Sequence, residues 1–260
     1  MITALDSATL KLIRVAKHIK AIEKCSREYA RGKPHKIVTD SQGKETADMR
    51  KSPPVDIAII AGEALYQLRS TLDHLAFDLV KLNQVGIPLP LEWEENCCFP
   101  LWIDPPKKMP VYNCFKSRLP NISKTSFAFI ESIQPYHKGS ASVICTPTIM
   151  GWLAHLSNID KHRYLNVIET TLSHHEVLTT SHGTSISVAS SGLKHGAEIQ
   201  PRVLPQPYPT VNVKRRFTVY VAFKEPAIGN GTMFSVQEVL KFCLKAIKKD
   251  IIPAFAQLLK

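Results

Sequence analysis

The sequence lacks any run approaching the roughly 20 apolar residues that a membrane-spanning helix needs, so we expect no transmembrane segment. Its start, Met1 to Asp6, has neither the basic opening nor the apolar core of a signal peptide. None of the six cysteines forms a Cys-x-x-Cys pair, which disfavours a zinc ribbon. Internal repeats and low-complexity segments are also missing. These absences predict a cytoplasmic globular protein whose cysteines are reduced.

The composition is that of an ordinary globular protein with an excess of positive charge. Hydrophobic residues make up 44% of the 260 residues and charged residues 21%, while the formal net charge is +11. The charge is uneven, because residues 1–55 hold twelve Lys or Arg but only six Asp or Glu. Positive charge of this size favours binding to nucleic acid or to other acidic surfaces.

Apolar residues recur at helical spacing in several segments of the chain. Asp6 and Ser7 offer an N-terminal cap for the first segment, and Gly32 with Pro34 ends it. A proline in the interior of the last segment, Pro253, should kink it. The pattern predicts five helices, at about residues 5–31, 56–83, 123–133, 147–163 and 235–259.

The period changes between the fourth and fifth predicted helices. Residues 164–170, 184–188 and 216–223 alternate or are β-branched, and glycines separate them. We therefore expect a small antiparallel β insertion at about residues 164–224. The fold class is α+β, a bundle of about five helices with this inserted sheet, in one domain over residues 1–260.

Two segments between the predicted helices read as loops, and the first of them is polar. Residues 33–55 should hold one short strand at most, at His35 to Thr39. Residues 84–120 are rich in proline and show little periodicity. We expect them to form a long ordered loop that packs Trp93, Phe99 and Trp102 onto the core.

A group of polar residues lies in the middle of the second predicted helix. Arg69 and Asp73 can pair at i,i+4, as can Ser70 and His74, and all four lie off the leucine stripe. One interpretation is an Arg–Asp pair that braces the helix beside a packing histidine. The other is chemical, because His can move a proton near neutral pH and Arg can hold a phosphate.

The spacing Arg69-x4-His74 resembles the Arg-x4-His pattern of HEPN domains, small helical bundles found in many prokaryotic RNA-cleaving toxins and defence proteins. The resemblance implies a metal-independent endoribonuclease, often built across a dimer. In it, His74 would be the general acid/base and Arg69 the phosphate stabiliser. Residues 62–70, with the later residues 158–163, also look like a widespread bacterial family of unknown function.

A second polar group ends the fourth predicted helix. On a helical wheel His155, Asn158 and His162 cluster, whereas Asp160 falls on the apolar side. A carboxylate there needs a partner, and Arg69 is the natural one if the second and fourth helices are neighbours, with Arg163 as the alternative. The group is either a buried brace with a basic C-terminal end, formed by Lys161, His162 and Arg163, or part of the active site.

Five basic residues follow the polar face of the first predicted helix. Their spacing fits a solvated helix face, and the alternative is a track for an RNA backbone. No aromatic residue is interleaved, so base stacking is not indicated. These residues are Lys17, Lys20, Lys24, Arg27 and Arg31.

Three functions follow from these patterns. The first is a HEPN-like metal-independent endoribonuclease, a toxin or defence effector, with catalytic residues Arg69, His74, Asn158 and His162 and with Ser70, Asp73, Asp160, Lys161 and Arg163 in support. It would need no cofactor, and its expected partners are RNA, a second copy of the chain and an inhibitor or antitoxin protein. The second is a non-catalytic RNA- or protein-binding module whose motifs are structural. The third is a metal-dependent hydrolase that uses His74, His155 and His162.

Overall fold

The computed structural model describes residues 3–82, 92–107, 110–137, 144–162, 168–180, 185–193, 195–199, 211–223 and 234–259. The described chain is mostly helical with small antiparallel sheets, which confirms the predicted α+β class. It divides into two compact units. Unit 1 comprises residues 1–22, 58–166 and 237–260, and unit 2 comprises residues 23–57 and 167–236. The predicted single domain stays a prediction.

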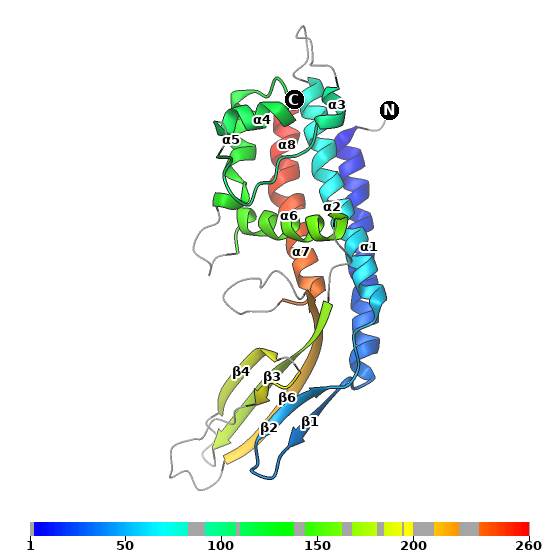
Figure 1. Cartoon of the computed structure of the whole chain (residues 1–260), viewed down its shortest axis with the longest axis vertical. Coiled ribbons are helices and arrows are strands. Elements are labelled where there is room, and N and C mark those ends of the chain that lie inside the picture. Colours follow the sequence, from blue (N-terminus) through cyan, green and yellow to red (C-terminus); the bar gives the residue numbers. More distant parts are fainter. Residues whose placement is uncertain are drawn as a thin grey trace. The chain divides into compact units, whose positions relative to one another are not determined.

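Unit 1 is helical and holds most of the core. Helices α1 (Ala4–Arg31) and α2 (Val55–Leu82) each begin or end in unit 2, and their unit 1 portions run side by side (Figure 1). Both bounds lie within one residue of the prediction. The leucines of α2 at positions 65, 68, 72, 75 and 79 are buried, as the apolar stripe predicts.

The proline-rich segment between α2 and the next long helix is not the uninterrupted loop that its sequence suggests. It contains the short helix α3 (Trp93–Asn96) and the helix α4 (Val111–Arg118). Phe99 is fully buried, Trp93 stacks on Phe77, and Trp102 meets Phe115 edge-on. The predicted packing of this segment onto the core is therefore confirmed. The prediction that the segment contains no helix is wrong.

The remaining helices of unit 1 follow the predicted order. They are α5 (Lys124–Ser132), the 3-10 turn Pro135–His137, and α6 (Thr146–His162), whose C-terminal end reaches α2 (Figure 1). The last segment is α7 (Val236–Ala246), a π-helical turn (Ile247–Ile251) and α8 (Ile252–Leu258). Pro253 lies at the start of α8. The wider π turn precedes it because proline has no backbone N–H and cannot donate an α-helical hydrogen bond.

The described residues of unit 2 form two three-stranded antiparallel sheets. The larger one has the order β4-β3-β6 and corresponds to the predicted insertion, with longer strands than expected. Its strands are β3 (Ile168–Thr180), β4 (Ser185–Leu193) and β6 (Val211–Phe223). The predicted start of its first strand, residues 164–167, lies outside the described residues.

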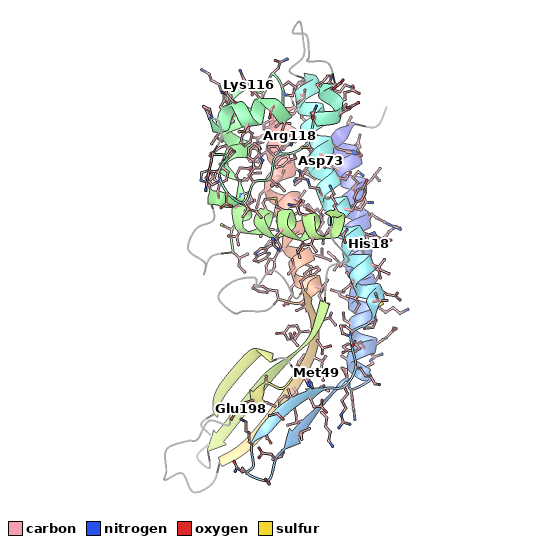
Figure 2. All side chains as sticks on the ribbon, in the orientation of Figure 1. His18, Met49, Asp73, Lys116, Arg118 and Glu198 are labelled. Atoms are coloured by element: carbon pink, nitrogen blue, oxygen red, sulfur yellow. The ribbon has the colours of Figure 1, made fainter. Side chains whose placement is uncertain are left out.

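The smaller sheet has the order β1-β2-β5, with β1 (His35–Thr39), β2 (Glu45–Met49) and β5 (Glu198–Ile199). The sequence indicated only its first strand. Met49 and Glu198 lie on it (Figure 2), and Lys44 pairs with Glu198 at 2.9 Å. Asp40 Oδ1 accepts the backbone N–H groups of Gln42 and Lys44, both at 2.9 Å. Gly43 supplies the positive φ of 81° that this hairpin turn needs.

No described helix is both long enough and apolar enough to pass through a lipid bilayer.

Candidate functional site

The Arg69–Asp73 pair clamps the backbone of a distant residue. Arg69 Nη2 lies 3.6 Å from Asp73 Oδ1 and also donates to the carbonyl oxygen of Phe99. Asp73 Oδ1 accepts the N–H of Phe99 at 2.9 Å. Both backbone groups of the fully buried Phe99 are thus satisfied by one helical pair. The i,i+4 pairing is confirmed, and its geometry is that of a structural brace.

The polar contact of His74 is with α1 rather than with this clamp. His74 is exposed, and its Nδ1 lies 2.9 Å from Ser7 Oγ on α1. Ser70, the i,i+4 neighbour, makes no hydrogen bond with His74, contrary to the predicted pairing. Partial desolvation of the ring lowers the pKa of His74, and the nearby positive charge of Lys11 lowers it further. The imidazole is therefore neutral at pH 7.

An open hollow of about 590 Å³ surrounds His74. Asp73 and Asp78 line this hollow. Arg69 is not among the described residues that line it. The remaining lining residues are Thr3, Ser7, Phe77 and Cys97. Within one chain, the structure therefore does not bring the Arg69 guanidinium and the His74 imidazole together around one cavity. Carboxylates on the wall also disfavour a phosphate there.

The end of α6 is only partly described. Asn158 and Lys161 are exposed, and His155 is half-buried. The His162 side chain and the whole of Arg163 lie outside the described residues, so the predicted roles of these two residues stay predictions. We predicted that Arg69 would pair with Asp160. The structure contradicts this prediction, because Asp73 and the carbonyl oxygen of Phe99 hold the Arg69 guanidinium.

Asp160 instead packs against Gly62 of α2. A Cβ at position 62 would lie 3.0 Å from Asp160 Cγ and closer still to Oδ1, so the absence of a side chain makes room for the carboxylate. Burial raises the pKa of Asp160. No described cation pairs with it. The segments 62–70 and 158–163, far apart along the chain, meet at this point.

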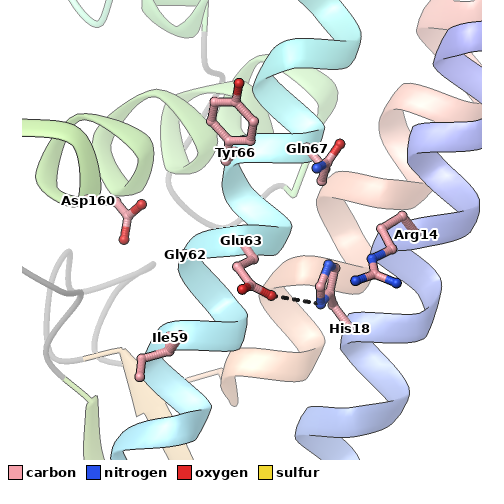
Figure 3. A pocket seen from close by; sticks show the side chains of 8 residues that line it. All are labelled: Arg14, His18, Ile59, Gly62, Glu63, Tyr66, Gln67 and Asp160. Carbon is pink, nitrogen blue, oxygen red and sulfur yellow. Dashed lines mark ion pairs between the residues drawn. The ribbon is translucent and has the colours of Figure 1, made fainter.

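This contact lies at the edge of an open groove of about 480 Å³ (Figure 3). Helix α2 forms its floor, α1 contributes Arg14 and His18 on one side, and α6 contributes Asp160 on the other. His18 Nδ1 lies 3.5 Å from Glu63 Oε2. Burial, with Arg14 nearby, lowers the pKa of His18 although Glu63 opposes the shift. The other lining residues are Ile59, Tyr66 and Gln67.

Sequence reasoning missed this groove. The sequence pattern of the first helix drew attention to the basic stripe and not to Arg14 or His18, and Gly62 and Tyr66 entered only through the family resemblance of residues 62–70. The signal that could have found the groove is Gly62 itself, a helix-interior glycine opposite a carboxylate on an apolar face. Such a glycine often marks a close approach of another element.

Metal binding finds no support in the described residues. No group of three or more His, Cys, Asp or Glu side chains among them is placed to hold a metal ion. His74 contacts Ser7, and the third predicted ligand, His162, falls outside the described side chains. The metal-dependent alternative therefore rests on sequence spacing alone.

The basic stripe of α1 is solvent-exposed over its whole length. Lys17, Lys20, Lys24, Arg27 and Arg31 are all exposed. None forms an ion pair with a residue that the structure describes.

The chain matches no family model, no curated protein and no solved structure. The resemblances to HEPN domains and to the bacterial family of unknown function therefore stay predictions.

Proposed function

We propose that this chain is a cytoplasmic RNA-binding protein that contacts the phosphate backbone through the basic stripe of α1. One observation carries the proposal: five basic side chains project from a single helix and lack ion-pair partners among the described residues. The net charge of +11 adds long-range attraction for a polyanion. Phosphate contacts of this kind bind without regard to sequence.

Binding to a fluorescent single-stranded RNA across a salt series tests the proposal. Each phosphate contact should contribute roughly 0.7 to the slope of log affinity against log salt. Replacing all five stripe residues by glutamine should weaken binding at least about tenfold at low salt and flatten the slope. The matched control replaces Lys107, Lys124, Lys245, Lys248 and Lys249, which are also exposed. Equal losses in both variants would show that only net charge matters and would overturn the stripe as the site.

A second candidate is metal-independent RNA cleavage, as a HEPN-like toxin or defence effector, with His74 as the general acid/base. The observation in its favour is an exposed, neutral imidazole oriented by Ser7 in an open hollow. The engagement of Arg69 with Phe99 and Asp73 weighs against it within one chain. Such an enzyme would need an inhibitor protein in its host cell. Cleavage assayed in EDTA with the wild type and His74→Ala separates this function from binding alone.

A further inference from the structure

Two large apolar side chains are exposed on the α2 floor of the groove. Ile59 is 42% exposed and Tyr66 is 55% exposed, seven residues apart and therefore on one face of the helix. Gly62, between them, adds no side chain to the floor. Exposed aliphatic and aromatic side chains on an otherwise polar surface mark a place where another chain docks.

The two walls of this groove carry opposite charges. Arg14 on the α1 wall is exposed and has no ion-pair partner among the described residues. Asp160 on the α6 wall likewise lacks a described cation, and it is partly desolvated against Gly62. Figure 3 shows these two side chains on either side of α2. A docking partner therefore has to present a negative group toward α1 and a positive group toward α6.

A second copy of the same groove meets this requirement in one orientation. A two-fold axis parallel to α2 exchanges the walls, so that the α6 wall of one copy faces the α1 wall of the other. A two-fold axis across α2 would set Asp160 against the partner's Asp160, and like charges would repel. Charge complementarity therefore favours a second copy of the chain as the occupant and a parallel arrangement of the two α2 helices.

We propose that the α2 face docks a second copy of the chain with the two α2 helices parallel, so that Asp160 meets the partner's Arg14. Tyr66 and Ile59 lie near the axis and pack against their own counterparts. The contact completes the environment of Asp160, whose carboxylate gains the cation that the described chain does not give it. The basic stripe stays outside this interface, since its residues do not line the groove.

The test uses the full chain in sedimentation velocity from about 5 to 100 µM. The wild type should dimerise, and Arg14→Glu and Asp160→Lys should each weaken the dimer at least about tenfold by placing like charges together. An equimolar mixture of the two variants should regain wild-type affinity, because the heterodimer has one inverted pair and one native pair. Lys17→Glu is the matched control, an equal charge change on the same helix outside the groove.

Two further measurements keep the result unambiguous. Tyr66→Glu, at an exposed position, should also dissociate the dimer without touching Asp160, so the proposal does not depend on Asp160→Lys folding well. Thermal melts confirm that each variant is folded. A monomeric wild type at 100 µM overturns the proposal, as does dissociation by Lys17→Glu to the same extent. No recovery on mixing two folded variants rejects the Asp160–Arg14 contact.

Discussion

The carboxylate of Asp160 packs against the backbone of Gly62, in the space that a Cβ at position 62 would otherwise fill. This contact joins the first residue of the segment 62–70 to the segment 158–163. It also brings α6 against α2 at the edge of the groove. The Gly62–Asp160 contact therefore sets how closely α6 approaches α2. It also places the negative charge of Asp160 at the edge of the groove.

Gly62→Ala should destabilise the protein despite the better helix propensity of alanine. The new methyl group would overlap the Asp160 carboxylate, and overpacking of this kind typically costs about 1–3 kcal/mol. Urea unfolding measures the change. Asp160→Ala in the same chain should relieve most of it, so the two changes should be strongly non-additive.

Gly151→Ala on α6 is the control for this experiment. A Cβ there would meet Pro135 Cβ at 3.5 Å, an ordinary contact. It should be neutral or stabilising by up to roughly 1 kcal/mol, because alanine favours the helix. If Gly62→Ala behaves like Gly151→Ala, the close packing of Asp160 on Gly62 is wrong.

Asp160→Asn should stabilise the monomer at neutral pH. Burial raises the pKa of Asp160 in the folded chain, so folding favours its protonated form. The ionised group therefore opposes folding at pH 7, and this opposition fades as the pH falls through the folded pKa toward the ordinary value of 3.8. Asparagine has no such charge, so its advantage should be largest at pH 7 and shrink on acidification.

Unfolding at low protein concentration, at pH 7 and near pH 4.5, measures this difference. Asp104→Asn, at an exposed carboxylate, is the control and should change little. Stability that falls in Asp160→Asn at pH 7 would mean that the native carboxylate already has a favourable partner within the chain.

The long helices could be predicted from the sequence because their signals are local. The ends of α1 and α2 lie within one residue of the expected positions, since apolar spacing and Pro or Gly at the ends define them. Strand β2 could not be found, because its residues Glu45–Met49 are mostly polar. Pairing with β1 and β5 and the burial of Ala47 hold it in place, and these are non-local contacts.

The same distinction holds for the candidate site. The Arg69–Asp73 pair follows from i,i+4 geometry, whereas its target, the backbone of Phe99, lies 26 residues beyond Asp73. The position of Asp160 on an apolar face was readable from the helical wheel. Its neighbour was not predictable, because Arg69 satisfies the charge argument, and only the structure shows that Asp73 and the Phe99 carbonyl hold the Arg69 guanidinium while Asp160 packs on Gly62.

Arg69→Ala should lower stability by about 2–3 kcal/mol. It removes a hydrogen bond from a charged donor and leaves the carbonyl of a fully buried residue without its partner. Asp73→Ala should act similarly through the Phe99 N–H, and the two losses should not add, since both release the same backbone segment. Arg118→Ala, at an exposed arginine of α4, should stay within about 0.5 kcal/mol of wild type. An unchanged melting temperature in Arg69→Ala would contradict the structural role and return this residue to the catalytic hypothesis.

If the chain cleaves RNA, the reaction should depend on His74 in its neutral form. His74→Ala should lower the rate in EDTA by about 10²–10⁴-fold, the usual contribution of a general acid/base. Desolvation and Lys11 lower the pKa of His74 from its ordinary value of 6.5. The cleavage rate should therefore stay constant as the pH falls to 6.5 and should decline only at lower pH. Lys11→Gln removes one cause of the shift, so the acidic limb of the pH profile should move to higher pH. Lys124→Gln, an equal charge change at an exposed position that lies outside the stripe and does not line the His74 hollow, should leave the limb in place. Equal cleavage by the wild type and His74→Ala would assign the activity to a contaminant or to other residues, and binding through α1 would then be the function that remains.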